Sequence, residues 1–185
     1  MIKSTDIKTI TLHCLYYFLC VVAAVVIDLF IIGSRNMYYT SGLAALFSGF
    51  VYMRLIKKTR AFGALTCLGL MMSVFFLASG HFVWTFLPSL ICGLLADYVA
   101  SQGRYGNANL NVTSFILFSF GNLSPIMTMW LAPKQYVAQL LAEGKTQEYI
   151  DAVMVPFDLA NVAFSIGFIV LMASLGAFIG QKYQD

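Results

Sequence analysis

The most constraining feature of this sequence is a series of apolar runs long enough to cross a lipid bilayer. A membrane-spanning helix needs about 20 mostly apolar residues. Six runs approach or exceed this length, and no long polar domain interrupts them. We therefore predict an all-α, polytopic membrane protein that forms one membrane domain over residues 1–185. The predicted helices cover about residues 7–32, 39–55, 60–79, 82–102, 109–131 and 156–180.

The composition agrees with a membrane protein and argues against other classes. Of the residues, 60% are hydrophobic and only 10% are charged, whereas a soluble domain carries about 25% charged residues. The net charge of +3 is small and not clustered, so nucleic acid is not an expected partner. The four cysteines lie in apolar runs without metal-ligand spacing, and we expect no disulfide and no metal site.

The distribution of lysine and arginine predicts the orientation, because cytoplasmic loops carry more of both. If both termini are cytoplasmic, eight basic residues lie inside and three lie outside. The outer three are Arg35, Lys134 and Lys145, and the segment RLIKKTR at residues 54–60 dominates the inner set. We predict that both termini lie inside, in the cytoplasmic membrane of a bacterium.

The longest connection, residues 133–155, is then outside. Its apolar residues recur at helical spacing on both sides of Gly144, which predicts two short amphipathic helices over the outer mouth of the bundle. Two interpretations stay open: the segment is a lid on a ligand pocket, or it rests passively on the membrane surface.

Polar and aromatic side chains gather in the outer half of the predicted bundle. A charged group at mid-membrane costs roughly 2.5–3.5 kcal/mol on insertion scales, so such groups usually face a cavity or a protein interior. Asp97 is an exception, because it lies toward the cytoplasmic end of its helix. The candidate ligand-binding residues are Asp28, Arg35, Tyr39, His81, Trp84, Asn122, Trp130, Tyr136, Asp158 and Asn161.

Structural roles remain open for several of these candidates. Trp84 is also typical of the aromatic belt at a membrane interface, and Asp158 also suits the start of a helix. Pro125 interrupts a helix beside Asn122 and Ser124. This break is explained either by polar neighbours that satisfy the freed carbonyl or by a locally irregular helix that lines a cavity.

Small residues at four-residue spacing mark close helix contacts. They fit either packing within the chain or docking of another membrane protein. The candidate docking residues are Ala23, Ala24, Ala45, Gly49, Ala173 and Ala177.

No Walker, HExxH or GxSxG motif is present. We therefore expect no enzyme activity and no resident cofactor, and an active transporter built on this chain requires partners that hydrolyse ATP.

Three runs carry a family resemblance: GFVYMRLIKKTRAFGAL (49–65), SGHFVWTFLPSLICGLLADYVASQGRY (79–105) and LAPKQYVAQLLAEGKTQEYIDAVM (131–154). They resemble the Trep_Strep family of bacterial integral membrane proteins, which are regarded as substrate-binding (S) components of energy-coupling factor (ECF) transporters. The resemblance implies capture of a micronutrient at the outer face and delivery inward with a T component and two cytoplasmic ATPases. It also implies that the ligand lies near residues 35–36, 80–82 and 133–155. S components usually dock through an AxxxA pattern in their first helix, whereas this chain has only Ala23 and Ala24 there.

The ligand class stays open at this point. The aromatic and amide groups of the outer half suit a flat vitamin, and they also suit haem or another tetrapyrrole with His81, Tyr136 or a methionine as axial ligand. Two further hypotheses are a membrane-embedded enzyme or assembly factor that uses His81 with the outer aspartates, and a purely structural subunit.

Overall fold

Every regular element that the computed structural model describes is a helix, which confirms the all-α prediction. The described residues are 4–34, 36, 38–79 and 83–183. The long elements are α1 (Ser4–Ile27), α2 (Thr40–Thr59), α3 (Ala64–Ala78), α4 (Phe86–Gln102), α5 (Ala108–Ser119) and α9 (Leu159–Lys182). Shorter helices are η1 (Asp28–Ile32), η2 (Val83–Thr85), η3 (Phe120–Leu123), α6 (Ser124–Leu131), α7 (Pro133–Ala142) and α8 (Gln147–Val153).

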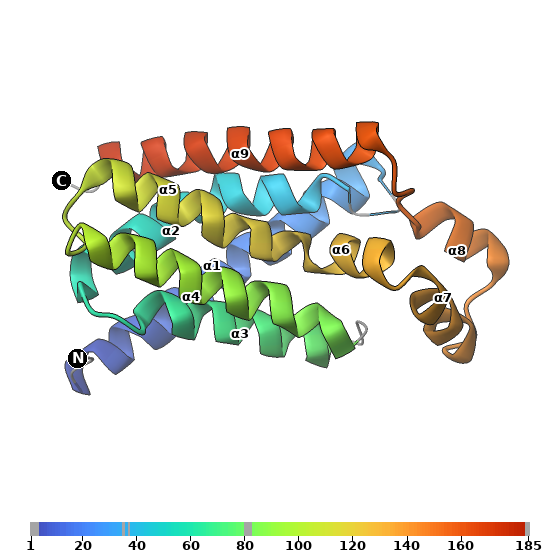
Figure 1. Ribbon diagram of the computed structural model, residues 1–185, viewed down its shortest axis with the longest axis horizontal. Helices are drawn as coiled ribbons and strands as arrows, with labels where there is room; N and C mark the ends of the chain where they lie inside the picture. The colour runs from blue at the N-terminus through green and yellow to red at the C-terminus, as the bar shows by residue number, and fades with distance from the viewer. Residues whose placement is uncertain (1–3, 35, 37, 80–82, 184–185) are drawn as a thin grey trace.

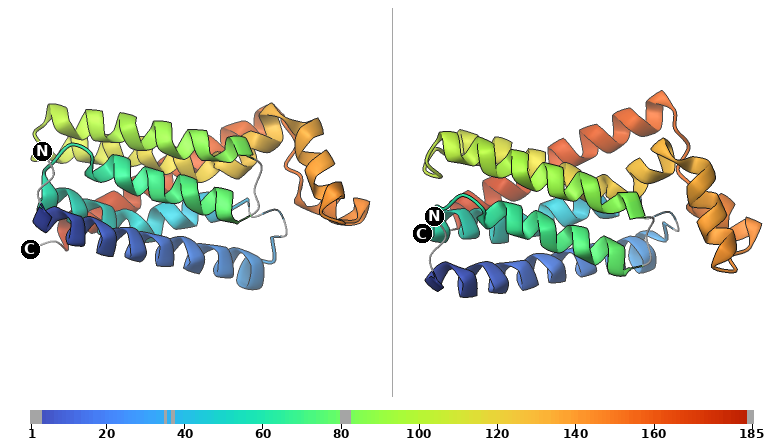
Figure 2. Two further views of the ribbon diagram at one scale, coloured as in Figure 1. Left: turned by 90° about the horizontal axis from the view of Figure 1, so that it is seen from below. Right: turned by 60° about the horizontal axis from the view of Figure 1, so that its bottom comes forward.

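The long helices lie side by side along the longest axis of the molecule, and α6 continues the line of α5 (Figure 1). Both termini lie at one end of this bundle, which we call the terminal end. Helices α7 and α8 lie at the opposite end of the molecule in the view of Figure 1 and in both views of Figure 2. We call α7, α8 and the turn between them the covering segment (residues 133–153).

The surface of the bundle is suited to lipid. Three helical stretches of the described chain are long and apolar enough to cross a membrane: Asp6–Ile32, Ala108–Leu131 and Leu159–Lys182. Large apolar side chains remain exposed along them, including Leu15, Leu19 and Phe178, and so wide an apolar surface requires lipid around it. Helices α3 and α4 are apolar but shorter than the usual span, so the six spans and their orientation remain predictions.

Helices α2 and α9 approach each other through glycine. A Cβ atom on Gly176 would lie 2.6 Å from the carbonyl oxygen of Ala45, and one on Gly180 would lie 2.7 Å from that of Gly49. Ala173 and Ala177 are fully buried in the core. We call this contact the α2–α9 seam, and it brings the two backbones together as small residues allow in membrane helices.

The α2–α9 seam accounts for four of the six candidate docking residues. Ala45, Gly49, Ala173 and Ala177 are all covered within the chain, so they form no exposed face. Ala24 is also fully buried, whereas Ala23 is exposed on α1. Of the two interpretations that the sequence left open, the geometry of the four residues corresponds to internal packing.

Some polar side chains buried inside the bundle bond one another and backbone carbonyls. The Tyr52 and Ser114 hydroxyl oxygens are 2.6 Å apart, and Ser114 donates to the carbonyl of Ala96 at 2.7 Å. This chain of bonds links α2, α5 and α4. It accompanies ring contacts of Tyr52 with Phe115 and Phe118 at 4.7 and 5.1 Å between centroids.

Asp97 is buried on α4 and organises the terminal end of α3. Its Oδ2 accepts bonds from the backbone N–H groups of Gly63 and Thr66 at 2.7 and 3.0 Å, and from the Thr66 hydroxyl at 2.9 Å. Its Oδ1 accepts the Tyr105 hydroxyl at 2.8 Å. The carboxylate thus supplies the N-terminal cap that α3 lacks in its own sequence, and α3 begins at Ala64 rather than at residue 60.

Replacing Gly49 by alanine should destabilise the protein, because the added methyl meets the backbone of Gly176 and overpacking typically costs about 1–3 kcal/mol. Gly167→Ala on α9 is the matched control, since a methyl there meets nothing within 4 Å. Thermal unfolding of both variants in the same detergent measures the difference. Equal melting temperatures would contradict the α2–α9 seam.

Asp97→Ala should lower the melting temperature more than Tyr105→Phe does. The first change removes every acceptor of the cap, and the second removes one bond to a charged group, worth about 1.5–3 kcal/mol. A larger loss in Tyr105→Phe than in Asp97→Ala would show that the carboxylate is not the organising group.

Candidate functional site

A cavity of about 440 Å³ lies between the bundle and the covering segment. Its lining includes residues of α7 and α8, and these helices lie at the end of the molecule opposite the termini (Figure 1). Small-molecule sites usually measure about 300–1,000 Å³ and combine apolar walls with a few polar groups. The size of this cavity is therefore that of a site for one small organic molecule.

The bundle supplies a largely apolar wall. Val21 and Val25 come from α1, and Phe75 and Phe76 come from the end of α3. Helix α2 contributes the small residues Thr40, Ser41 and Ala44. Because these α2 side chains are short, space is left between α1 and α2 in front of the covering segment.

A second wall comes from the break between α5 and α6. Pro125 has no N–H, so the carbonyl of Gly121 loses its usual helical partner. The hydroxyls of Ser89 and Ser124 donate to that carbonyl at 2.9 and 2.6 Å. Pro125 itself lines the cavity, so both interpretations of the break hold together: polar neighbours satisfy the backbone, and the irregular helix forms a cavity wall.

Asn122 lies in this break and faces the cavity. Its Nδ2 lies 3.1 Å from the hydroxyl oxygen of Tyr17, and its Oδ1 lies 3.3 Å from the same atom. Tyr17 is fully buried. The pair fixes the orientation of the amide at the cavity wall, which makes Asn122 a preorganised polar group for a ligand.

The covering segment closes the cavity with a more polar face. Tyr136 and Gln139 come from α7, Glu143 directly follows α7, and Lys145 and Tyr149 lie on the turn and on α8. Gln139 donates to Glu143 at 2.8 Å, and the Lys145 ammonium lies 5.1 Å from the centre of the Tyr149 ring. One side of the cavity thus carries both a carboxylate and an ammonium group.

Burial is the main cause that raises the pKa of Tyr136 to about 12, with smaller contributions from Tyr149 and Glu143. The hydroxyl is therefore protonated at neutral pH. It is available as a hydrogen-bond donor to a ligand, and a phenolate bond to haem iron would require that proton to leave.

Asp28 supports the cavity from behind and does not line it. It is fully buried at the start of the π-helical η1. Its Oδ2 accepts the Tyr39 backbone N–H at 3.1 Å and the Thr40 hydroxyl at 2.7 Å. Its Oδ1 has no partner among the described residues. Asp28 thus fixes the start of α2, and with it Thr40, which is part of the cavity wall.

Four other candidates have structural contacts away from the cavity. The Tyr39 ring packs edge-on against Phe164 and Phe168, and the Trp130 indole donates to the carbonyl of Val155 at 3.1 Å. Asp158 caps α9 by accepting the Asn161 N–H at 2.8 Å. The Asn161 side chain in turn bonds Asp158 and the Tyr38 hydroxyl.

Trp84 is exposed and is not among the cavity residues, as expected for a residue of the aromatic belt. Arg35 and His81 lie outside the described residues. Of the ten sequence candidates, Asn122 and Tyr136 are therefore the two that the structure places on the cavity wall.

Several cavity residues were not predicted from the sequence, and the reason differs among them. Phe75, Phe76 and Ser41 look like ordinary helix residues. Gln139 and Glu143 could have been found, since they share a helix face with Tyr136 at spacings of three and seven residues.

A family model covers nearly the whole chain. The model described as a hypothetical bacterial integral membrane protein (Trep_Strep) matches residues 5–184. The chain belongs to the Trep_Strep family. No curated protein and no solved structure matches it. Membership shows that this Trep_Strep protein is an integral membrane protein, in agreement with its exposed apolar helices.

Asp28→Ala should destabilise this Trep_Strep protein, because it leaves the Tyr39 N–H and the Thr40 hydroxyl without their acceptor. An unsatisfied buried donor costs about 1–3 kcal/mol. Asp28→Asn is the matched variant, since its side-chain oxygen still accepts, and it should retain more stability. Thermal unfolding in detergent measures both, and equal stability of the alanine variant and the unmodified protein would contradict this role.

Proposed function

We propose that this Trep_Strep protein is the substrate-binding S component of an ECF-type importer in the bacterial cytoplasmic membrane. The observation that carries the proposal is the cavity between the bundle and the covering segment. A site that is walled by helix ends and covered by a separate helical segment suits capture of a solute from one side of the membrane.

The charge distribution supports an outward-facing cavity. Lys8, Arg54, Lys58 and Lys182 belong to the terminal end, whereas Lys134 and Lys145 belong to the covering segment. The positive-inside rule then places the terminal end in the cytoplasm. In this proposal six segments span the bilayer. Local thinning of the bilayer, or the residues that flank α3 and α4, compensates for the shorter length of these two helices.

The walls of the cavity favour an amphipathic organic micronutrient. Phe75, Phe76 and Ile126 offer apolar contact to a flat or hydrocarbon portion, and Asn122 offers an oriented amide. Glu143 and Lys145 on the covering segment suit a polar or charged end of the ligand. The proposed ligand is thus a vitamin-like molecule with one apolar and one polar end.

A tetrapyrrole-binding S component is the second candidate. The specific observation in its favour is that Tyr136 and Met129, both possible axial ligands, line the same cavity. An enzyme or assembly factor is disfavoured, because Asp158 is bonded in a helix cap away from the cavity and Asp28 is buried behind its wall. In this proposal the chain itself does not hydrolyse ATP, and a T component and two ATPases supply the energy.

Protein purified in mild detergent from cells grown in rich medium should carry one small organic molecule, identified by mass spectrometry and by its visible spectrum. A strong Soret band would select the tetrapyrrole. Val25→Trp should reduce the bound ligand at least about tenfold, because the new ring occupies the cavity. Val26→Trp is the matched control, since Val26 is exposed on the neighbouring face of α1.

Retention of the ligand in Val25→Trp with an unchanged melting temperature would rule out the cavity as the binding site. The importer assignment is tested separately by co-expression with the T component and ATPases of the same bacterium. A stable complex that accumulates ligand only with intact ATPases is expected, and its absence would refute the ECF assignment while leaving the cavity as a binding site.

A further inference from the structure

A second, smaller pocket of about 180 Å³ lies between α1 and α2 toward the terminal end. It is separate from the ligand cavity and shares none of its lining residues. Its lining residues are Leu12, His13, Tyr16, Phe50, Val51, Arg54 and Lys58. We call it the inner pocket.

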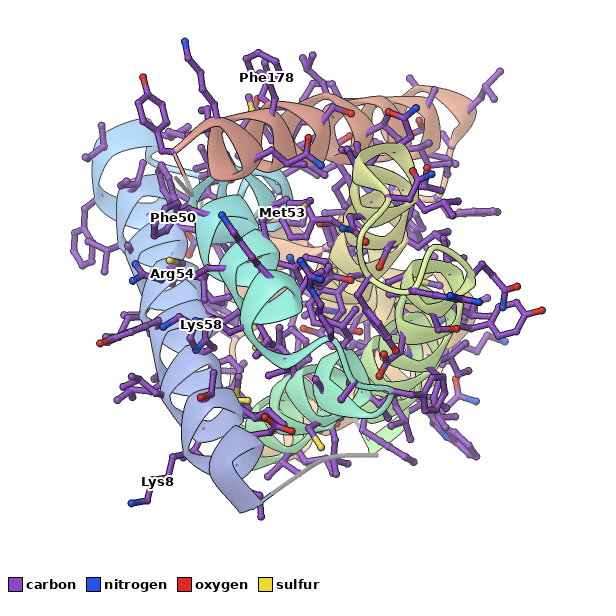
Figure 3. The ribbon with its side chains drawn as sticks, turned by 90° about the vertical axis from the view of Figure 1, so that its left-hand side faces the viewer. Lys8, Phe50, Met53, Arg54, Lys58 and Phe178 are labelled. Carbon is purple, nitrogen blue, oxygen red and sulfur yellow. The ribbon has the colours of Figure 1, made fainter. Side chains whose placement is uncertain are left out.

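The inner pocket is basic. Arg54 and Lys58 are one helical turn apart on α2 and therefore project on one side of it. Figure 3 views the terminal end and shows Arg54 and Lys58 on the side of α1, with Lys8 apart from them. The lining residues that the structure describes include no aspartate or glutamate. Two cations without a carboxylate at a small pocket favour an anionic ligand.

His13 gives an independent indication of a ligand. The ring is 2% exposed, and its Nδ1 lies 2.7 Å from the carbonyl oxygen of Thr9, so Nδ1 is the donor. The other ring nitrogen, Nε2, is buried and has no hydrogen-bond partner among the described residues. Buried polar atoms are normally satisfied. Because Nδ1 carries the proton, Nε2 of the neutral ring is an acceptor, and a hydroxyl group of a ligand in the inner pocket would supply the missing donor.

The open side of the inner pocket continues into an apolar stripe. Leu12, Tyr16 and Leu19 are 44%, 45% and 52% exposed, and their spacing places them on one face of α1. This stripe runs from the pocket toward the middle of the bilayer. An anion with hydrocarbon chains can therefore place its charge at Arg54 and Lys58 and its chains along α1.

We propose that the inner pocket binds the headgroup of an anionic membrane lipid, with Arg54 and Lys58 at the phosphate and His13 Nε2 accepting from a hydroxyl of the headgroup. Basic pockets between membrane helices on the cytoplasmic side are suited to such headgroups. The apolar stripe is the reason for choosing a lipid over a free phosphate. This proposal does not rest on the ECF assignment.

Native mass spectrometry of the full chain in a non-ionic detergent tests the proposal. The protein is titrated with phosphatidylglycerol and with phosphatidylcholine of the same chain length, and phosphatidylglycerol should bind preferentially. Each basic side chain near an anionic lipid contributes roughly fivefold, so Arg54→Gln with Lys58→Gln should weaken phosphatidylglycerol binding about 25-fold. Lys8→Gln removes one charge at the same end outside the pocket and should leave binding unchanged.

Three results would overturn the proposal: equal binding of the two lipids, an equal loss in Lys8→Gln and in the double variant, or displacement of the lipid by excess glycerol 3-phosphate or inorganic phosphate. The last result would assign the pocket to a free phosphate. His13→Leu should also weaken phosphatidylglycerol binding, and unchanged binding in a folded variant would remove His13 from the site.

Discussion

The close approach of α2 and α9 is the contact on which the other features of this protein depend. Near the terminal end, glycine and alanine allow backbone to touch backbone at Gly49 and Gly176. At the other end, the Tyr39 ring packs against Phe164 and Phe168 of α9. With α2 held along its length against α9, another part of its surface receives α1, and the short side chains Ser41 and Ala44 of α2 line the cavity. In lipid, where helices gain little from hydrophobic burial against each other, such close packing is a principal source of association.

Polar groups in this bundle have two distinct roles. Asp97 and Ser114 are saturated by neighbouring donors and acceptors, and they hold helix ends and crossings in place. Asn122 and His13 instead border pockets, and the described residues leave His13 Nε2 without a partner. An unsatisfied polar atom is costly in a low-dielectric interior. Of these atoms, His13 Nε2 belongs to a residue that lines a pocket, whereas Asp28 Oδ1 does not.

Much of the fold could be predicted from sequence, because apolar length and helical periodicity respond directly to the bilayer. The paired short helices of residues 133–153 were expected from their apolar spacing around Gly144. The site was harder to predict. The cost of a carboxylate in lipid favoured a ligand contact for Asp28, but the structure shows Asp28 bonded at the start of α2 and outside the cavity wall. Asp158, which is exposed, caps a helix in the same way. Phe75 and Phe76 carry no local signal at all, since only the packing of α3 against its neighbours decides whether an aromatic ring faces lipid, core or cavity.

The bond from the Trp130 indole to the Val155 carbonyl has a mechanical consequence. It joins the residues at which the chain leaves the bundle toward α7 and returns from α8, so the covering segment is a loop pinned at its base. Because its ends are held together, the segment has less closure entropy to lose when it packs over the cavity. A movement that kept this bond would turn the segment about its base and would open the cavity on the side farthest from Trp130.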